Sequence, residues 1–160
     1  MRDSFRDFPP YEGDGPYLYF AFAEADSKKV REYMRLLYER GCRVWYSRGK
    51  ADGPEEVLRR QARYRGAALT MVYLSDEACK DQNTKSSVLV NQKFDSPIVC
   101  LDPDGKDRLL AMGLRESVPR IPLYRLRSGE ALEEAIARCD SLRIRYTLEN
   151  VNGNPQVMQY

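Results

Sequence analysis

The feature that most constrains the fold is the alternation of wholly apolar runs with helix-like segments. Residues 17–23 (YLYFAFA) place apolar side chains on both faces of an extended chain, which is typical of a strand buried in a parallel sheet. A segment follows in which apolar residues such as Val30 and Leu37 recur at the helical period until Gly41, and residues 42–46 form a second apolar run. Because parallel neighbours need a crossover connection, this order predicts an open α/β sheet, whose ligands bind beyond the carboxyl ends of the strands.

The same alternation continues through most of the chain. Three further apolar runs predict strands at residues 67–74, 97–101 and 120–124. After Pro54 a helical segment is expected, with one face made by Val57, Leu58, Gln61 and Ala62. The handedness of crossover connections then favours a five-stranded parallel sheet in the order 2-1-3-4-5 with helices on both faces. In this topology three polar stretches converge at one edge of the sheet, and they are residues 23–26, 47–53 and 75–83.

The chain divides into one domain with shorter flanking segments. Residues 1–16 are rich in proline and glycine and predict an irregular lead or linker, while residues 17–140 form the domain. Residues 141–149 alternate apolar and polar side chains, which predicts an extra edge strand or an arm onto another subunit. Residues 150–160 are expected to form a flexible tail.

Composition excludes several classes of function. With 26 basic and 24 acidic residues the net charge is only +2, so the charge predicts neither a nucleic acid nor a membrane as partner. Histidine is absent, which excludes Ser-His-Asp and Cys-His catalysis and His-ligated metal, and we expect no metal site. The four cysteines are widely spaced, and the chain has neither a secretion-signal pattern nor an apolar membrane span. We therefore expect reduced thiols and a cytoplasmic location.

Motifs exclude two other families of open α/β sheets. Neither the P-loop pattern nor the dinucleotide-binding glycine pattern is present. A receiver domain would need an aspartate at the end of the third strand, where this chain has Leu74 and Ser75. We therefore expect this open sheet to be neither a nucleotide-binding domain of the P-loop or glycine-motif type nor a receiver domain.

In the order and spacing of several short phrases the chain resembles Toll/interleukin-1 receptor (TIR) domains, bacterial ones in particular. The phrase Gly-x-x-Val-Trp-Tyr is the most specific of them, and the resemblance covers residues 17–140. The matching pieces are residues 19–22 with Asp26, residues 37–47, the glycine- and proline-containing loop at residues 49–54, and Leu74-Ser75. The resemblance implies a flavodoxin-like domain that signals by homotypic association.

Many bacterial and plant members of that family also cleave the nicotinamide bond of NAD and sometimes cyclise the product. They use a glutamate on the third crossover helix, whose carboxylate steadies the positive charge of the oxocarbenium-like centre. In this chain the glutamate position falls on Ser87, which cannot supply that charge. Three further polar positions of the family are occupied by Ala21, Phe22 and Ser47. The resemblance therefore implies a domain without NAD-cleaving activity.

The residues expected around the ligand cleft follow from the same resemblance, and no confident catalytic residue is among them. They are Ala21, Phe22, Glu24, Asp26, Trp45, Ser47, Ser75 and Ser87. From the residues alone, a tryptophan such as Trp45 in an apolar strand is more often a core side chain than a stacking ring, and Glu24 and Asp26 can equally be loop or helix-capping groups. Glu77 and Glu24 are candidate substitutes for the missing carboxylate, as is a second subunit.

Our hypothesis is a TIR-like signalling or nucleotide-sensing domain in a bacterial signalling or defence system. The alternative is an NAD glycohydrolase or ADP-ribose cyclase with a relocated carboxylate. No cofactor is required, and NAD or an ADP-ribose derivative is the expected ligand. Partners would be other TIR domains or further copies of this chain, bound weakly and in a salt-sensitive manner. The interaction residues expected in the loop at 47–54 are Arg48, Lys50, Asp52 and Gly53, with residues 142–148 as a second route.

Overall fold

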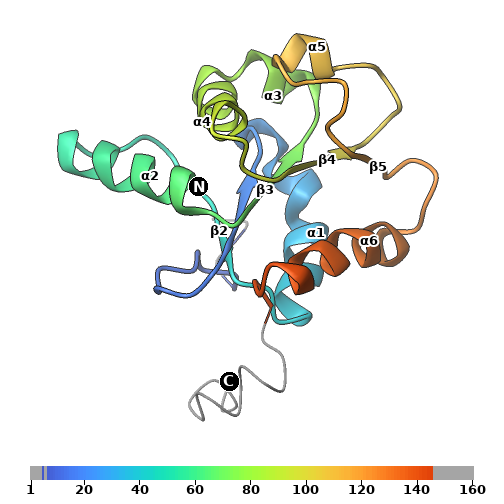
Figure 1. The fold of residues 1–160 in the computed structure, drawn as a ribbon, viewed down its shortest axis with the longest axis horizontal. Coiled ribbons are helices and arrows are strands. Elements are labelled where there is room, and N and C mark those ends of the chain that lie inside the picture. The colour runs from blue at the N-terminus through green and yellow to red at the C-terminus, as the bar shows by residue number, and fades with distance from the viewer. Residues whose placement is uncertain (1–4, 6, 146–160) are drawn as a thin grey trace.

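A parallel five-stranded sheet forms the centre of the molecule in the computed structural model, which describes residue 5 and residues 7–145 (Figure 1). The strand order is β2-β1-β3-β4-β5, and every pairing is parallel. The strands are β1 (Leu18–Ala21), β2 (Val44–Trp45), β3 (Leu69–Tyr73), β4 (Ile98–Asp102) and β5 (Arg120–Pro122). The predicted fold class, a flavodoxin-like α/β sheet in the order 2-1-3-4-5, is confirmed.

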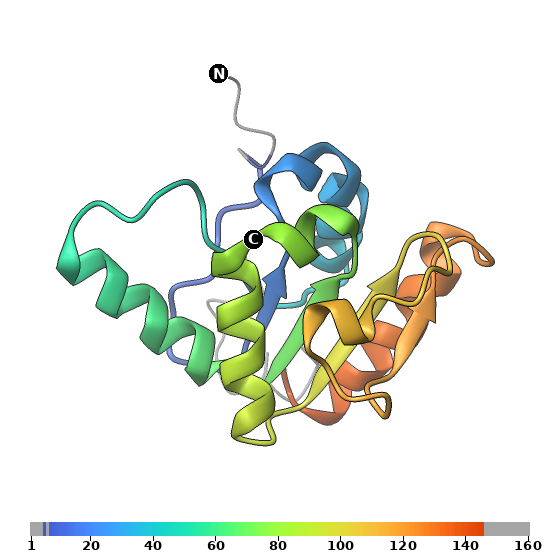
Figure 2. The same ribbon diagram turned by 90° about the horizontal axis from the view of Figure 1, so that it is seen from above.

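Helices cover both faces of this sheet (Figures 1 and 2). One face packs against α1 (Ser27–Glu39) and α6 (Ser128–Ser141), and the other against α4 (Gln82–Lys93) and α5 (Leu109–Met112). The remaining elements are the short turn η1 (Glu24–Asp26), α2 (Pro54–Gly66) and α3 (Asp76–Lys80). In the described part of the chain, no helix is long and apolar enough to cross a membrane.

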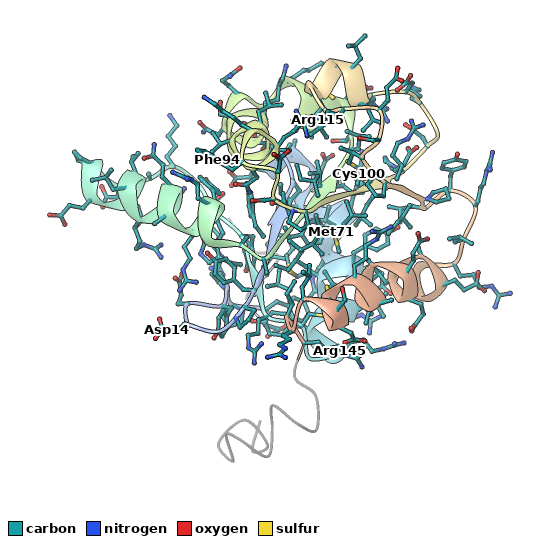
Figure 3. All side chains as sticks on the ribbon, viewed as in Figure 1. Asp14, Met71, Phe94, Cys100, Arg115 and Arg145 are labelled. Atoms are coloured by element: carbon teal, nitrogen blue, oxygen red, sulfur yellow. The ribbon has the colours of Figure 1, made fainter. Side chains whose placement is uncertain are left out.

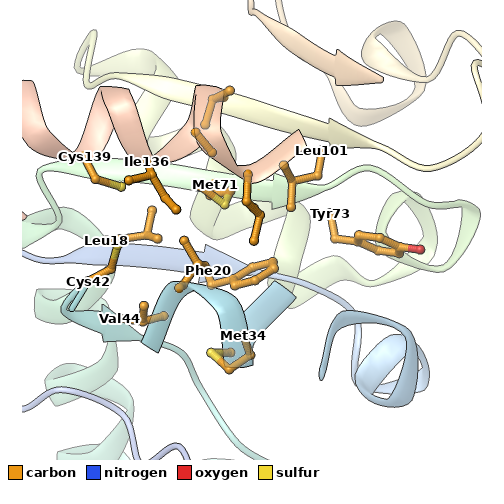
Figure 4. Packing of buried hydrophobic residues seen from close by; sticks show 14 of the residues in the cluster. Leu18, Phe20, Met34, Cys42, Val44, Met71, Tyr73, Leu101, Ile136 and Cys139 are labelled. Carbon is orange, nitrogen blue, oxygen red and sulfur yellow. The ribbon is translucent and has the colours of Figure 1, made fainter. Parts of the chain in front are cut away.

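The two faces of the sheet build two separate cores, which is why the strands are apolar throughout. In β1, Leu18 and Phe20 enter the core under α1 and α6, whereas Tyr19 and Ala21 enter the core under α4. Met71 of β3 lies in the first core and is seen with Leu18 and Phe20 in Figure 4. A polar side chain on either face of these strands would therefore lie in one of the two cores.

Glycines with positive φ angles set the ends of the two helices nearest the candidate site. Gly41 (φ 79°) follows α1, and its N–H donates to the carbonyl of Tyr38 at 3.0 Å. Gly53 (φ 91°) precedes α2, whose first residue is Pro54. The polar stretch 75–83, for which no helix was predicted, contains α3. The Ser75 hydroxyl caps that helix by accepting the Ala78 N–H at 3.0 Å.

Both flanking segments run along the outer edge of β2. The N–H of Tyr11 in the lead donates to the carbonyl of Val44 at 2.8 Å, and the N–H of Arg43 donates to that of Ile144 at 3.0 Å. Arg145 forms an isolated antiparallel bridge with Cys42. Described residues of the lead form no helix or strand, and Phe5 is buried in the core. Of the edge strand predicted at 141–149, Ser141 is the last residue of α6, and residues 146–149 lie outside the described residues, as does the predicted tail at 150–160.

Candidate ligand-binding cleft

A cleft of about 730 Å³ opens at the carboxyl ends of β1 and β2. Three stretches surround it: the η1 turn with the start of α1, the loop after β2, and the start of α4. The three polar stretches expected to converge each contribute lining residues. The lining side chains in the described chain are Phe5, Tyr19, Phe22, Glu24, Ala25, Ser27, Lys28, Ser47, Arg48, Gly49, Arg60, Tyr64, Asp81, Asn83 and Thr84. Its size is within the range of small-molecule sites in proteins.

Aromatic rings form one wall of the cleft. Tyr19 of β1 and Tyr64 of α2 both line it, with ring centroids 4.9 Å apart. Trp45 lies behind them, 5.5 Å from Tyr19 and 5.2 Å from Tyr64, with only 1% of its surface exposed. Phe22 adds a further ring to the lining and packs edge-on against Phe5 at 5.4 Å. Phe22 and Tyr64 are only partly buried, so their rings offer flat apolar surface on which a planar heterocycle can stack. Tyr19 is 3% exposed and supports Tyr64 from behind.

Ser87 lies in α4, buried next to Tyr19 and outside the set of lining residues. Its hydroxyl donates to the carbonyl of Thr84 at 2.9 Å, so the hydrogen bond of 2.8 Å to Tyr19 has the Tyr19 hydroxyl as donor. Burial raises the pKa of Tyr19 well above its usual value. The pair is therefore a neutral hydroxyl pair, with no charge directed at the cleft.

Positive charge reaches the cleft from three different elements. Lys28 comes from the first turn of α1, Arg48 from the loop after β2, and Arg60 from α2. The Arg60 guanidinium donates to the carbonyls of Arg48 at 2.6 Å and Gly49 at 2.8 Å, and its Nε donates to Glu56 at 3.0 Å. Arg60 therefore holds the loop after β2 against α2 while presenting its charge to the cleft.

Two carboxylates also line the cleft, and they differ in what they already bind. Asp81 caps α4, since its carboxylate accepts the Asn83 N–H at 3.1 Å and the Thr84 hydroxyl at 3.1 Å. Glu24 extends from η1 and is exposed. Glu77, the other candidate carboxylate, is exposed on α3 and does not line the cleft. Glu24 is therefore the candidate substitute that the structure brings to the cleft.

A second polar pair lies at the ends of β1 and β3, buried beside the cleft. The Ser75 hydroxyl donates to the carboxylate of Asp26, and Lys29 Nζ lies 3.9 Å from that carboxylate. Asp26 is 1% exposed, and a carboxyl group buried to this extent needs polar partners within the protein. Together with desolvation, which is the larger cause, Asp26 raises the pKa of Tyr73 to about 12. This pair ties the η1 turn to the end of β3.

The structure therefore separates the expected cleft residues into two groups. Phe22, Glu24 and Ser47 line the cleft. The expected residues that are buried and do not line it are Ala21, Asp26, Trp45, Ser75 and Ser87. Of the expected interaction residues, Arg48 lines the cleft, and the exposed residues of the same loop are Lys50, Asp52 and Gly53.

Sequence reasoning missed the lining residues that lie within regular elements. Tyr19 is in a strand with apolar residues on both faces, so nothing in its pattern marks the end of its side chain as accessible. Arg60 and Tyr64 come from α2, for which the sequence predicted only the face made by Val57, Leu58, Gln61 and Ala62. The available signal was topological, because α2 follows the loop after β2 and must return past the same sheet edge.

Metal chemistry receives no support from the side chains. Within residues 5 and 7–145 there is no group of three or more His, Cys, Asp or Glu residues that could hold a metal ion. The cysteines of this part of the chain are free thiols, and burial raises the pKa of Cys100 to about 12.

Comparison with known proteins gives a likeness in fold only. No protein-family model and no curated protein matches this sequence. Among solved structures, a "pilus assembly-related protein" from Burkholderia pseudomallei is similar with a TM-score of 0.48 and 19% sequence identity. The match covers 82% of this chain and 94% of that one. At these values the likeness carries no argument about function.

Proposed function

We propose that this chain is a TIR-like signalling module whose cleft binds NAD or an ADP-ribose derivative without cleaving it. The observation that carries the proposal is the environment of Ser87. Its hydroxyl is buried against Tyr19, at the position where the TIR resemblance would place the catalytic carboxylate.

The lining of the cleft supports binding of a nucleotide. A dinucleotide has two planar rings and a negatively charged diphosphate, and it needs stacking surfaces next to cations. Tyr64 and Phe22 supply stacking surface, and Lys28 and Arg60 supply positive charge. A volume of about 730 Å³ is of the order that such a ligand needs.

The residue at the family's glutamate position argues against cleavage, because Ser87 has no carboxylate. Breaking a glycosidic bond through an oxocarbenium-like transition state requires a carboxylate beside the anomeric carbon. Loss of one positioned electrostatic group commonly lowers the rate by about a hundred- to a thousandfold. The polar side chains that TIR enzymes carry nearby are also replaced here by Ala21 and Phe22. We therefore expect binding without turnover.

A second candidate function is NAD glycohydrolase or cyclase activity that uses Glu24. This alternative is specific because Glu24 lines the cleft whereas Glu77 does not. It predicts nicotinamide release by the wild-type protein, and loss of that release in Glu24→Gln. The non-cleaving proposal predicts no release from either protein.

The test combines thermal unfolding with nicotinamide detection. NAD and ADP-ribose should raise the unfolding temperature, because a ligand at a hundred times its dissociation constant stabilises the native state by about 2.7 kcal/mol. Lys28→Ala should reduce this shift, while Lys93→Ala, at the far end of α4, serves as the matched control. If neither nucleotide shifts the transition at millimolar concentration, the nucleotide proposal is wrong.

The signalling part of the proposal requires a protein partner. By the TIR resemblance this would be another TIR-like domain, a second copy of this chain included. The loop after β2 supports an interaction role, since Lys50 and Asp52 are exposed and carry opposite charges. Charges of this kind affect association rate and specificity more than affinity.

A further inference from the structure

Helix α2 projects from the body of the protein. Figures 1 and 2 show it extending away from the sheet, with its amino-terminal end farthest out. None of its residues, all of which the structure describes, is fully buried. For a 13-residue helix this is unusual, because helices in proteins depend mainly on packing of an apolar face.

The inner side of α2 is held by polar contacts. Arg60 bonds to the loop after β2, as described above, and Arg63 Nη2 donates to the carbonyl of Gly13 at 3.0 Å. The hydroxyl of Tyr17 donates to the carbonyl of Arg63 at 2.7 Å, and the Arg63 guanidinium lies 4.7 Å from the Tyr17 ring centroid. These contacts fix which side of the helix faces outward.

The outer face of α2 is apolar at its middle and charged at its ends. We define the α2 outer face as Glu55, Val57, Leu58, Gln61, Ala62 and Arg65, all of which are exposed. Val57 and Leu58 expose 42% and 66% of their surface. Arg65 lies over the ring of Phe94 at 4.1 Å, and Phe94, labelled in Figure 3, is itself 57% exposed. Apolar surface therefore continues from α2 onto the end of α4.

The charges of the α2 outer face complement those of a second copy of the same face that runs in the antiparallel direction. The first turn of α2 is acidic and its last turn is basic. Two such helices side by side in parallel would set Glu55 against Glu55 and Arg65 against Arg65. In the antiparallel arrangement each Glu55 meets the Arg65 of the other copy, and the helix dipoles are also opposed.

We propose that the α2 outer face binds the α2 outer face of a second copy of this chain, antiparallel about a two-fold axis near the middle of the helix. Leu58 of each copy then packs near Ala62 of the other, flanked by two Glu55–Arg65 ion pairs. Such an isologous contact uses one surface twice, as the commonest homodimers do. This proposal rests on the self-association that the proposed function includes, and it names the surface that mediates it. It does not depend on any ligand in the cleft.

The proposed contact is small, and this sets its expected strength. A helix of 13 residues is about 20 Å long at 1.5 Å per residue, so two crossing helices bury well below the roughly 1,200–2,000 Å² of a stable interface. Association is therefore expected to be weak and visible only at high protein concentration. Because the flanking ion pairs are exposed, added salt should weaken the association further.

Charge reversal tests the orientation and the surface together, using sedimentation over a range of concentrations. Glu55→Arg and Arg65→Glu should each weaken self-association, because each turns two attractive contacts into repulsive ones. The double variant Glu55→Arg/Arg65→Glu should restore it, and an equimolar mixture of the two single variants should form heterodimers. Rescue of this kind cannot arise from misfolding of either single variant.

Apolar substitutions provide the matched control. Leu58→Glu should raise the dissociation constant by about tenfold or more, as expected for a residue at the centre of an interface. Leu110→Glu, on α5 at a side chain that is 88% exposed, should leave it unchanged. A wild-type protein that stays monomeric at about 1 mM overturns the inference and the proposed self-association. If association survives Leu58→Glu and both charge reversals, the assignment of the α2 outer face is wrong but self-association stands. Nucleotide binding is measured separately in either case.

Discussion

At the scale of single residues, the contact between Ser87 and Tyr19 bears most directly on the proposed function. Tyr19 is 3% exposed and donates its hydroxyl proton to Ser87, which passes a hydrogen bond on to the carbonyl of Thr84. Both hydroxyls are thereby satisfied without any charged group. A glutamate at position 87 would have to place its carboxylate in the same buried space.

We predict that Ser87→Glu destabilises the protein without creating NAD cleavage. An ionised carboxylate without a partner in a buried site costs several kcal/mol, so unfolding should require about 3 kcal/mol less free energy. Ser87→Ala removes a hydrogen bond and should cost only about 1 kcal/mol. Urea unfolding measures both, and a stable Ser87→Glu protein that releases nicotinamide would contradict this reading of the site.

The backbone at Gly53 gives a second prediction at this scale. A Cβ atom at Gly53 would meet no atom within 4 Å, so the cost of Gly53→Ala comes only from the φ of 91°, and we expect about 1 kcal/mol. Gly129 in α6 has equally open space and no positive φ, so Gly129→Ala should be neutral or slightly stabilising. Equal effects of the two substitutions in chemical denaturation would show that φ is not the cause.

At the scale of elements, the sequence predicted the five strands because their apolar runs are bounded by turns and glycines. It missed α3, since five polar or small residues show no helical period and the helix depends on its Ser75 cap. The face of α2 with Val57 and Leu58 was predicted from periodicity alone. What periodicity could not indicate is that this face is in solvent, because that depends on the polar contacts of Arg60 and Arg63 on the opposite side.

Arg60 should control the order of the loop after β2. Its two hydrogen bonds to backbone carbonyls require the forked guanidinium, which lysine cannot reproduce. In Arg60→Lys we predict faster amide hydrogen exchange at residues 47–53, with little change in α1 or α4. Arg59→Lys, on the exposed part of the same helix, is the control. Unchanged exchange in the Arg60 variant would mean that the loop is held by other contacts.

At the scale of the whole molecule, Arg108 joins three parts of the carboxyl edge of the sheet. Its guanidinium donates to Asp104 at 2.6 and 2.8 Å, to Asp76 at 2.8 Å and to the carbonyl of Leu74 at 3.3 Å. These bonds lower the pKa of Asp104 to about 2 and also lower the pKa of Asp76. The network links α3, the end of β3 and the loop after β4.

Acid titration should reveal this network. Both aspartates have a lower pKa in the folded protein than the roughly 3.9 of an unfolded chain, so their contribution is complete above about pH 4 and is lost as the pH falls toward 2. Arg108→Met should flatten the dependence of unfolding temperature on pH in this window. Arg115→Met, which breaks the exposed pair with Asp95, should not. Equal pH profiles for wild type and Arg108→Met would refute the assignment.

The site as a whole could be predicted only in outline. Topology placed three polar stretches at one edge, and that edge has the cleft. Tyr19 and Arg60, which line the cleft, and Ser87, which is buried beside it, are held by contacts between elements far apart in the sequence. Periodicity within one element carries no information about such contacts.

The most direct test of the central claim is a proton NMR time course of the wild-type protein with NAD. Saturation transferred from the protein to the adenine and nicotinamide protons reports binding, and the free nicotinamide resonances report cleavage in the same tube. We predict saturation transfer, with nicotinamide accumulating no faster than in NAD alone. Nicotinamide growing faster than in that control, or saturation transfer that is absent at millimolar NAD, would contradict a cleft that binds the nucleotide and leaves it intact.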